Sequence, residues 1–247
     1  MARPISPFSE HSLTEWIGLL QQATSPDERY RALLAVKSLG SLDDAVAWSR
    51  HSLRDADSAV RALAAKQLGE GKRLPAGEVA PWNEIATELT ERLADSDIDV
   101  RFETARALGR IRSDDESSKG VLLSLLDDDG IQPLMTASIV TALGERSDVD
   151  VALLAPRYGM LLSHEQAEVR ESVSAAVAGW DQQASSLVEP LMIALDDEEP
   201  LVRENAALAL GRAGVASEAI LSALRTASTD EDEVVAEAAR ESLRRLG

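Results

Sequence analysis

The sequence contains no cysteine, only four lysines, and aromatic residues at 3% of its length. Without cysteine the chain forms no disulfide and no thiolate metal site. With so few aromatic residues, a hydrophobic core has to be built from leucine, alanine and valine, and small alanine side chains let helices approach each other closely. These shortages favour an all-helical protein held together by aliphatic packing.

Positive charge is also scarce, since the net charge is −18 at pH 7. Nucleic acid is a poor partner for such a chain, because binding to phosphates draws on lysine and arginine. An anionic membrane surface is disfavoured for the same reason. No apolar run reaches the length of a membrane span, and the N-terminal residues have no apolar signal core. We therefore expect a cytoplasmic protein, monomeric and without a cofactor.

What the chain does have is an internal repeat of seventeen residues, seen most clearly at 53–69, 93–109 and 195–211. Each copy begins with leucine, has aspartate third and Val-Arg at eight and nine, and ends in Leu-Gly. Looser copies lie at 24–40, 128–144, 162–178 and 228–244, so that the start-to-start steps are 29, 40, 35, 34, 33 and 33 residues. A period in this range is typical of stacked supersecondary units rather than of one closed globule.

Each copy has the apolar spacing of an amphipathic helix. In 93–109, Val100, Thr104, Ala107 and Leu108 follow the i, i+4, i+7, i+8 pattern. Aspartates near the start predict N-terminal capping, and the closing glycine (109 in this copy) predicts the helix end. Second amphipathic stretches lie between the copies, for example at 42–53, 117–126 and 184–195. We therefore predict about seven helix–turn–helix units, fourteen helices in all.

The predicted domain organisation is a flexible lead-in at 1–11 followed by one solenoid at 12–247. A stretch rich in glycine and proline near 70–82 predicts an extended loop inside the solenoid, before a helix that begins near Trp82.

The pattern D-x-x-V-R-x-x-A-A-x-A-L-G, with a helix of the form VEPLMIAL at 188–195, resembles the HEAT repeat in its phycobilisome-lyase-like subclass. The resemblance covers about residues 12–247. It implies a right-handed superhelix of helix pairs in which the Val-Arg helices line the concave side. The subclass is used mostly as a binding scaffold, so the resemblance is specific for the fold and much less so for the function.

Within this frame the repeated valines and leucines (Val60, Val100, Val202, Leu68, Leu108 and Leu210) are expected to form the core. Two interpretations are open for the repeated arginines, Arg61, Arg101, Arg170 and Arg203. They form an anion-binding ladder, or they pair with aspartates of the same or the adjacent unit. We favour pairing, with Asp57, Asp97 and Asp197 as the candidate partners.

The residues between the repeated positions share the face of each Val-Arg helix opposite the core. We call this face the inner strip and predict that it binds a protein or peptide. The inner strip consists of Lys66, Asp99, Phe102, Glu103, Arg106, Arg110, Glu145, Glu168, Glu171, Leu201, Glu204, Asn205, Leu208 and Arg212. An exposed Phe102 beside two arginines would suit a binding hot spot, although a plain solvated face with one stray aromatic residue is an equal alternative.

No catalytic or metal-binding pattern emerges. The HEAT-like deoxyhypusine hydroxylases bind two irons through several His-Glu pairs, and this chain has only His164-Glu165, for which a capping or surface role is expected. Asp95, Asp97 and Asp99 resemble the start of a calcium loop, but neither its glycine nor its final glutamate follows. Phosphate-loop, nucleophile-elbow and zinc-ligand patterns are missing from the sequence as well.

Two hypotheses follow. The first is a non-catalytic scaffold that binds a protein or peptide in the groove lined by the Val-Arg helices. The alternative is a protein resembling phycobilin lyases or isomerases, in which arginines would hold the propionates of a tetrapyrrole. A HEAT-like DNA repair glycosylase would need a basic groove, which the net charge of −18 contradicts.

Overall fold

The computed structural model describes residues 7–71, 81–112, 115–128, 130–144, 146 and 149–247. These residues form fourteen α-helices and one 3₁₀ helix, and no strand. The helices are α1 (Leu13–Gln22), α2 (Pro26–Leu39), α3 (Leu42–Ser52), α4 (Ser58–Gly71), α5 (Trp82–Thr90), α6 (Ile98–Ile111), α7 (Glu116–Leu126), α8 (Pro133–Gly144), α9 (Val151–Leu161), α10 (Ala167–Ala178), η1 (Asp181–Leu187), α11 (Val188–Ala194), α12 (Pro200–Ala213), α13 (Glu218–Ala227) and α14 (Glu233–Leu246). The predicted all-α class and the number of helices are confirmed.

The chain divides into two compact units, Met1–Leu123 and Ser124–Gly247, with the boundary inside α7. The prediction of one solenoid over 12–247 stays a prediction. The predicted lead-in at 1–11 and the loop near 70–82 fall mostly on residues outside the described part; at the loop, α4 extends to Gly71 and α5 begins at Trp82.

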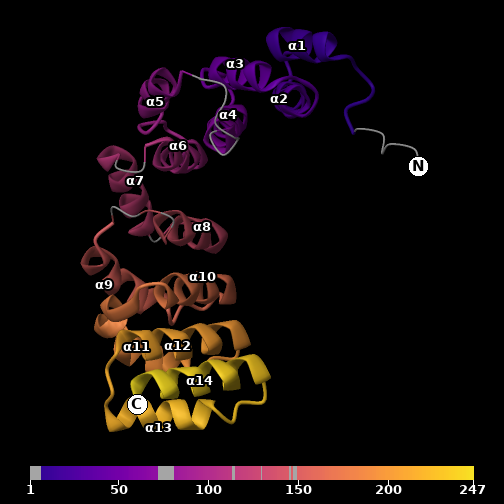
Figure 1. Ribbon diagram of the computed structural model, residues 1–247. Coiled ribbons are helices and arrows are strands. Elements are labelled where there is room, and N and C mark those ends of the chain that lie inside the picture. Colours follow the sequence, from indigo (N-terminus) through magenta and orange to yellow (C-terminus); the bar gives the residue numbers. More distant parts are fainter. Residues whose placement is uncertain (1–6, 72–80, 113–114, 129, 145, 147–148) are drawn as a thin grey trace. The chain divides into compact units, whose positions relative to one another are not determined.

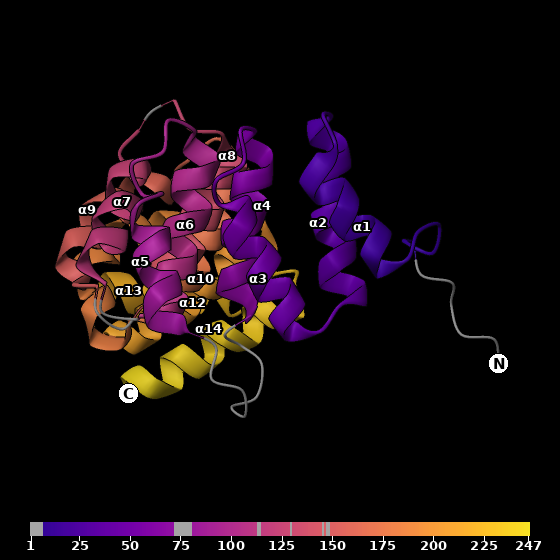
Figure 2. The same cartoon turned by 90° about the horizontal axis from the view of Figure 1, so that it is seen from above.

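In the first unit, α1 packs on α2, α3 on α4, and α5 on α6. We call α2, α4 and α6 the second helices of this unit, and the other three its first helices. The second helices pack side by side, α4 against α6 most extensively (Figures 1 and 2). The first helices of neighbouring pairs lack comparable packing against each other within the described residues. The Val-Arg helices therefore form the tightly packed layer of this unit.

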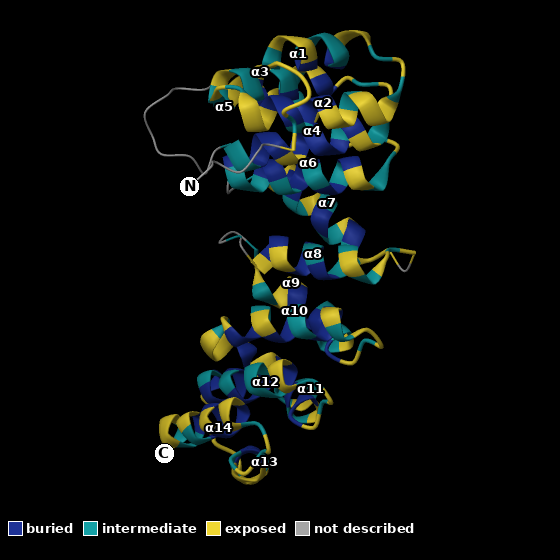
Figure 3. Cartoon of the chain, turned by 90° about the vertical axis from the view of Figure 1, so that its right-hand side faces the viewer, coloured by how far each residue is buried: buried dark blue, intermediate teal, exposed yellow. Residues whose placement is uncertain are grey.

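The second unit repeats the arrangement. Its second helices α8, α10, α12 and α14 form one packed layer, while α9, α11 and α13 cover them from one side (Figure 1). Figure 3 shows buried positions on the helix faces that meet neighbours and exposed positions on the faces turned outward. The repeat valines and leucines expected in the core, among them Val60, Val100 and Leu210, are at most 1% exposed.

Aspartates begin several second helices as predicted. Asp97 Oδ1 accepts hydrogen bonds from the backbone N–H groups of Asp99 (3.0 Å) and Val100 (3.2 Å). Asp57 caps α4 in the same way, through Ala59 and Val60. Each cap satisfies helix N–H groups that have no partner within the helix.

The predicted role of the repeat glycine is confirmed at Gly40, which is the C-cap of α2, and wrong at Gly109. Gly109 does not end α6, which continues to Ile111. The equivalent Gly69 shows the physical reason, because a Cβ there would lie 2.7 Å from Cα of Ala107 in α6. At Gly211 in α12 a Cβ would lie 2.8 Å from Cα of Ser242 in α14. The glycine of Leu-Gly thus lets neighbouring second helices pack backbone to backbone.

Candidate partner-binding surface

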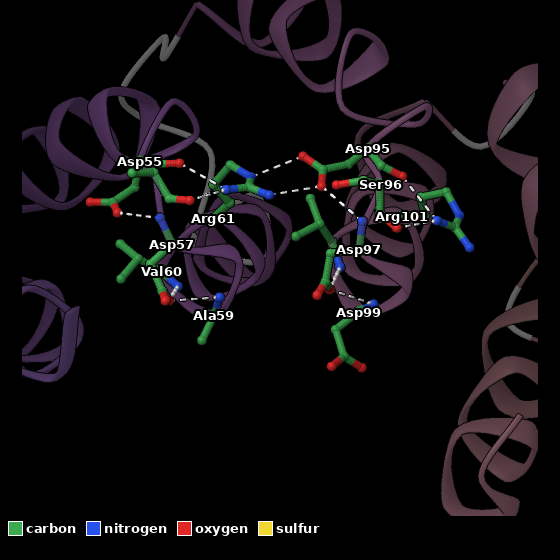
Figure 4. Close-up of polar contacts among 12 residues, drawn as sticks. Asp55, Asp57, Ala59, Val60, Arg61, Asp95, Ser96, Asp97, Asp99 and Arg101 are labelled. Atoms are coloured by element: carbon green, nitrogen blue, oxygen red, sulfur yellow. Dashed lines mark hydrogen bonds and ion pairs between the residues drawn. The ribbon is translucent and has the colours of Figure 1, made fainter.

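The repeat arginines link successive helix pairs through aspartates. Arg61 in α4 donates from Nε and Nη2 to the two carboxylate oxygens of Asp95, each at 2.9 Å. Its Nη1 donates to the backbone carbonyls of Asp55 (2.8 Å) and Ala56 (3.0 Å). Figure 4 shows the Arg61 guanidinium between the turn before α4 and the turn before α6. A single side chain therefore holds two consecutive repeats together.

The same arrangement occurs at four places, which we call the Arg–Asp ladder. Its pairs are Arg29–Asp55, Arg61–Asp95, Arg170–Asp197 and Arg203–Asp230, with N···O distances of 2.7–3.0 Å. The side chains of these pairs are only 6–14% exposed. In each bond the aspartate is the third residue of the following repeat. The ladder is structural and lies at the turns, away from the inner strip.

The predicted pairing of repeat arginines with aspartates is confirmed, but two of the three predicted aspartate partners are wrong. Asp197 is a ladder partner, whereas Asp57 and Asp97 are wrong as partners because their carboxylates cap helices. Arg29 was missed, because the repeat frame 24–40 places Ala32 at the arginine position. Arg29 precedes Asp55 by 26 residues in the sequence, and the arginines of the last two pairs precede their aspartates by 27. This similar spacing is the signal that would have identified Arg29.

The ladder aspartates are held in the charged form. The hydrogen bonds from Arg61 keep the pKa of Asp95 below its ordinary value, against the opposing effect of burial. Arg203 lowers the pKa of Asp230 in the same way. These carboxylates therefore stabilise the fold only while they are ionised.

Arg101 differs from the other ladder arginines. Its Nη1 donates to the carbonyls of Asp95 (2.9 Å) and Ser96 (3.1 Å), as in the ladder, but within the described part of the chain it has no carboxylate partner (Figure 4). The third residue of the next repeat is Gly130, which has no side chain to offer. Arg101 is therefore a natural comparison for Arg61.

In the fifth repeat, His164 stands where the ladder has aspartate. Its Nδ1 accepts a hydrogen bond from the backbone N–H of Gln166 at 3.1 Å, as Asp95 does from Asp97. This bond lies in the turn before α10 and does not cap the helix, because Gln166 is the N-cap residue and α10 has no side-chain cap. Across the described residues, no group of three or more His, Asp or Glu side chains is placed to hold a metal ion.

The inner strip of the first unit does not have the exposed aromatic residue that was predicted. Phe102 is 5% exposed and belongs to the core, so its prediction as an exposed hot spot is wrong. Arg106 lies over the Phe102 ring at 5.7 Å, and Asp99 and Lys66 are exposed. Arg110 is half-buried.

Charges on this part of the strip neutralise each other. Glu103 accepts hydrogen bonds from Arg106 Nε (3.0 Å) and Nη2 (2.7 Å), and burial raises the pKa of Glu103 despite that partner. Glu70 accepts a hydrogen bond from Lys37. Burial opposes ionisation of Glu70, but Lys37, with the nearby charges of Lys66 and Arg106, brings its pKa below the ordinary value. The carboxylate of Glu103 on this face is therefore already paired, while Asp99 and Lys66 remain exposed.

The strip of the second unit is different. Glu168 is exposed, Glu171 and Glu204 are half-exposed, and within the described residues none of the three has a cationic partner. Leu201, on the same exposed side of α12, is 54% exposed. Leu208 follows it two turns later and is half-buried. The helices α10 and α12 that carry these residues pack side by side, so the acids and leucines form one surface.

Two predicted strip residues join helices instead. Asn205 Nδ2 donates to Ser174 Oγ at 3.3 Å, and Arg212 Nη1 donates to the carbonyl of Ala178. Both bonds connect α12 to α10. Glu145 lies outside the described residues.

The charge of the chain is concentrated beside this surface. Residues 124–247 contain 23 acidic and 9 basic residues, a net charge of −14, whereas residues 1–123 contain 20 and 16, a net charge of −4. No helix in the described part of the chain is both long and apolar enough to cross a membrane.

Comparison with known proteins identifies the fold. Residues 154–244 match the family model described as HEAT repeats. An engineered protein of known structure is 22% identical over 95% of this chain and 68% of its own, with a TM-score of 0.65. An archaeal HEAT-like repeats protein from Thermococcus onnurineus NA1 is 16% identical over 96% and 97% of the two chains, with a TM-score of 0.58.

A computationally designed armadillo repeat protein for modular peptide recognition is 20% identical over 81% of this chain and 98% of its own, with a TM-score of 0.57. No curated protein matches the chain. The chain is thus a helical repeat protein with the fold of HEAT and armadillo proteins.

Proposed function

We propose that the chain is a non-catalytic scaffold that binds a protein or peptide on the inner strip of its second unit. The observation that carries the proposal is the set of unpaired carboxylates around an exposed leucine on α10 and α12: Glu168, Glu171, Glu204 and Leu201. Carboxylates gathered on one face repel each other, and a partner bearing lysine or arginine would relieve that repulsion.

The contrast with the first unit supports this choice. There the strip carboxylate Glu103 already has Arg106 as a partner, the neighbouring Glu70 has Lys37, and Phe102 is buried. Repeat scaffolds present extended surfaces of this kind. The designed armadillo protein of similar fold was made for peptide recognition, which is in keeping with the proposal.

The tetrapyrrole-binding alternative, which the resemblance to the phycobilisome-lyase-like subclass suggested, has less support. It needs arginines that are free to hold propionates. On the inner strip Arg106 is engaged by Glu103, and Arg212 by the carbonyl of Ala178. Adding bilin to the purified protein tests it directly, because a lyase-like protein would shift the visible absorption band.

Affinity purification from the native host with mass spectrometry tests the scaffold role. We expect the triple variant Glu168→Lys/Glu171→Lys/Glu204→Lys to lose its main partner. A control with the same net charge reverses three exposed acids in turns between helices, Glu165→Lys/Asp196→Lys/Glu231→Lys, and should keep that partner. If both variants keep or lose the partner alike, the inner strip is not the binding surface.

A further inference from the structure

A cleft of about 730 Å³ lies in the other layer of the second unit, between α9 on one side and η1 and α11 on the other. Its walls are mostly apolar: Val151, Ala155, Pro156, Met160, Leu187 and Pro190. Met160 is 72% exposed and adjoins the other apolar residues of the cleft, so that together they form an exposed apolar patch. All the lining residues belong to the second unit, and none belongs to the inner strip.

The local sequence explains why the cleft is open. The helices α9 and α11 have no extensive contact with each other within the described chain, and the 3₁₀ helix η1 (residues 181–187) contacts both of them. Gly159 brings α9 close to the floor, since a Cβ there would lie 3.3 Å from Leu187 Cδ2. The cleft is therefore formed by well-packed elements rather than by a loose segment.

Buried aromatic packing holds the same region rigid. Tyr158 is fully buried and stacks on Trp180, with ring centroids 5.1 Å apart. Its hydroxyl donates to the carbonyl of Val140 at 3.2 Å, which ties α9 to α8. A preformed cleft loses little conformational entropy when a partner enters it.

Most charges on the bounding elements are negative. Helices α9, η1 and α11, with the capping residue of α9, carry Asp150, Arg157, Asp181 and Glu189. Both Arg157 Nε and Nη2 donate to Asp127, so this cation is already neutralised. The three carboxylates have no ion-pair partner among the described residues. Asp150 lines the cleft, and the exposed Glu189 directly precedes the lining residue Pro190. An apolar cleft with these acids is complementary to an apolar ridge flanked by basic side chains.

We propose that this cleft binds an amphipathic helix of a partner protein, with an apolar ridge against Met160, Leu187 and Pro190 and with lysine or arginine beside the ridge facing Asp150 and Glu189. A partner helix in the cleft would lie between α9 and α11 and contact both. Recognition of an amphipathic helix in an apolar groove through residues at i, i+3, i+4 and i+7 is a common binding mode.

The test is titration of the full chain, by fluorescence anisotropy, with a labelled helical peptide of about 18 residues, or five turns. The peptide carries leucine at i, i+3, i+4 and i+7 and lysine on both flanks; a second peptide has glutamate in place of lysine. We expect the lysine peptide to bind at least about tenfold more tightly than the glutamate peptide. Equal affinities, or no binding of either peptide, overturn the proposal.

Two matched variants locate the site. Met160→Lys places a charge at the wall of the cleft, and Leu153→Lys places the same charge on α9 at a residue that is 48% exposed and does not line the cleft. We expect a loss of about tenfold or more for Met160→Lys and less than about twofold for Leu153→Lys. Equal losses in the two variants place the peptide elsewhere and overturn the proposal.

A third variant tests the role of Asp150 and Glu189 without disturbing the fold. Asp150→Asn/Glu189→Gln removes two charges, and asparagine still caps α9. We expect it to weaken the lysine peptide and to leave a serine-flanked peptide unchanged. Sedimentation of the chain without peptide tests a second copy as the occupant. Self-association that Met160→Lys abolishes would assign the cleft to a dimer and overturn the proposed partner.

Discussion

Replacing Arg61 with alanine should cost far more stability than the same replacement at Arg101, although the two arginines occupy equivalent positions in consecutive repeats. Arg61 makes two hydrogen bonds to the Asp95 carboxylate and two to backbone carbonyls, and its side chain is 12% exposed. Its loss leaves Asp95, which is 6% exposed, as a nearly buried charge without its cation. Breaking such a pair costs about 3 kcal/mol or somewhat more.

Arg101 provides the matched control because, among the described residues, its side chain makes only the two carbonyl bonds. Its loss should cost about 1 kcal/mol. Both arginines lie in the first unit, so urea denaturation followed by circular dichroism reports the same transition for both variants. We expect a difference of about 2 kcal/mol in the free energy of unfolding. Equal losses would refute the claim that the ladder pair, rather than the arginine itself, stabilises the repeat.

Three further predictions concern the same unit. Gly69→Ala should destabilise by about 2 kcal/mol in denaturant unfolding because its Cβ would collide with α6, whereas Gly18→Ala, with no atom within 4 Å of its Cβ, should stabilise by a few tenths to about 1 kcal/mol. Phe102→Ala should lower the free energy of unfolding by about 3–5 kcal/mol, since the ring is buried. A decrease below about 1 kcal/mol would mean that Phe102 is exposed, as the sequence predicted. The pKa of Asp95 is lower in the folded chain than in the unfolded chain, where it is about 4. The stabilisation by the ionised Asp95 is therefore fully present above the pKa of the unfolded chain, and it is lost as the pH falls through the pKa of the folded chain. Stability profiles of the wild type and Arg61→Ala should therefore converge toward acidic pH, and parallel profiles would contradict this.

Local sequence patterns predicted the helices, their caps and the core, because these depend on spacing within one helix. Val100 is buried, Asp97 caps α6, and α5 begins at Trp82, all as expected. The same spacing could not show how closely second helices approach each other. Glycines of the repeat, such as Gly69, lie at that contact inside a helix rather than at its end.

The charge pattern of the inner strip could not be predicted from the sequence, and the strip as a binding face stays a prediction. Whether a carboxylate on this face is paired depends on cations from other repeats, such as Lys37 for Glu70, 33 residues away. The repeat frame also obscured Arg29, since the first repeat has a different register. The cleft beside Met160 could not be predicted, because it depends on η1 replacing part of a regular helix.

Carboxylate footprinting tests the central proposal most directly. The chain, alone and with its captured partner, is labelled with carbodiimide and glycine ethyl ester, and the modified residues are quantified by mass spectrometry. The proposed function predicts that the partner protects Glu168, Glu171 and Glu204, while Glu165 and Glu231 label equally in both samples. Unchanged labelling of the three strip residues, with protection elsewhere, would contradict it.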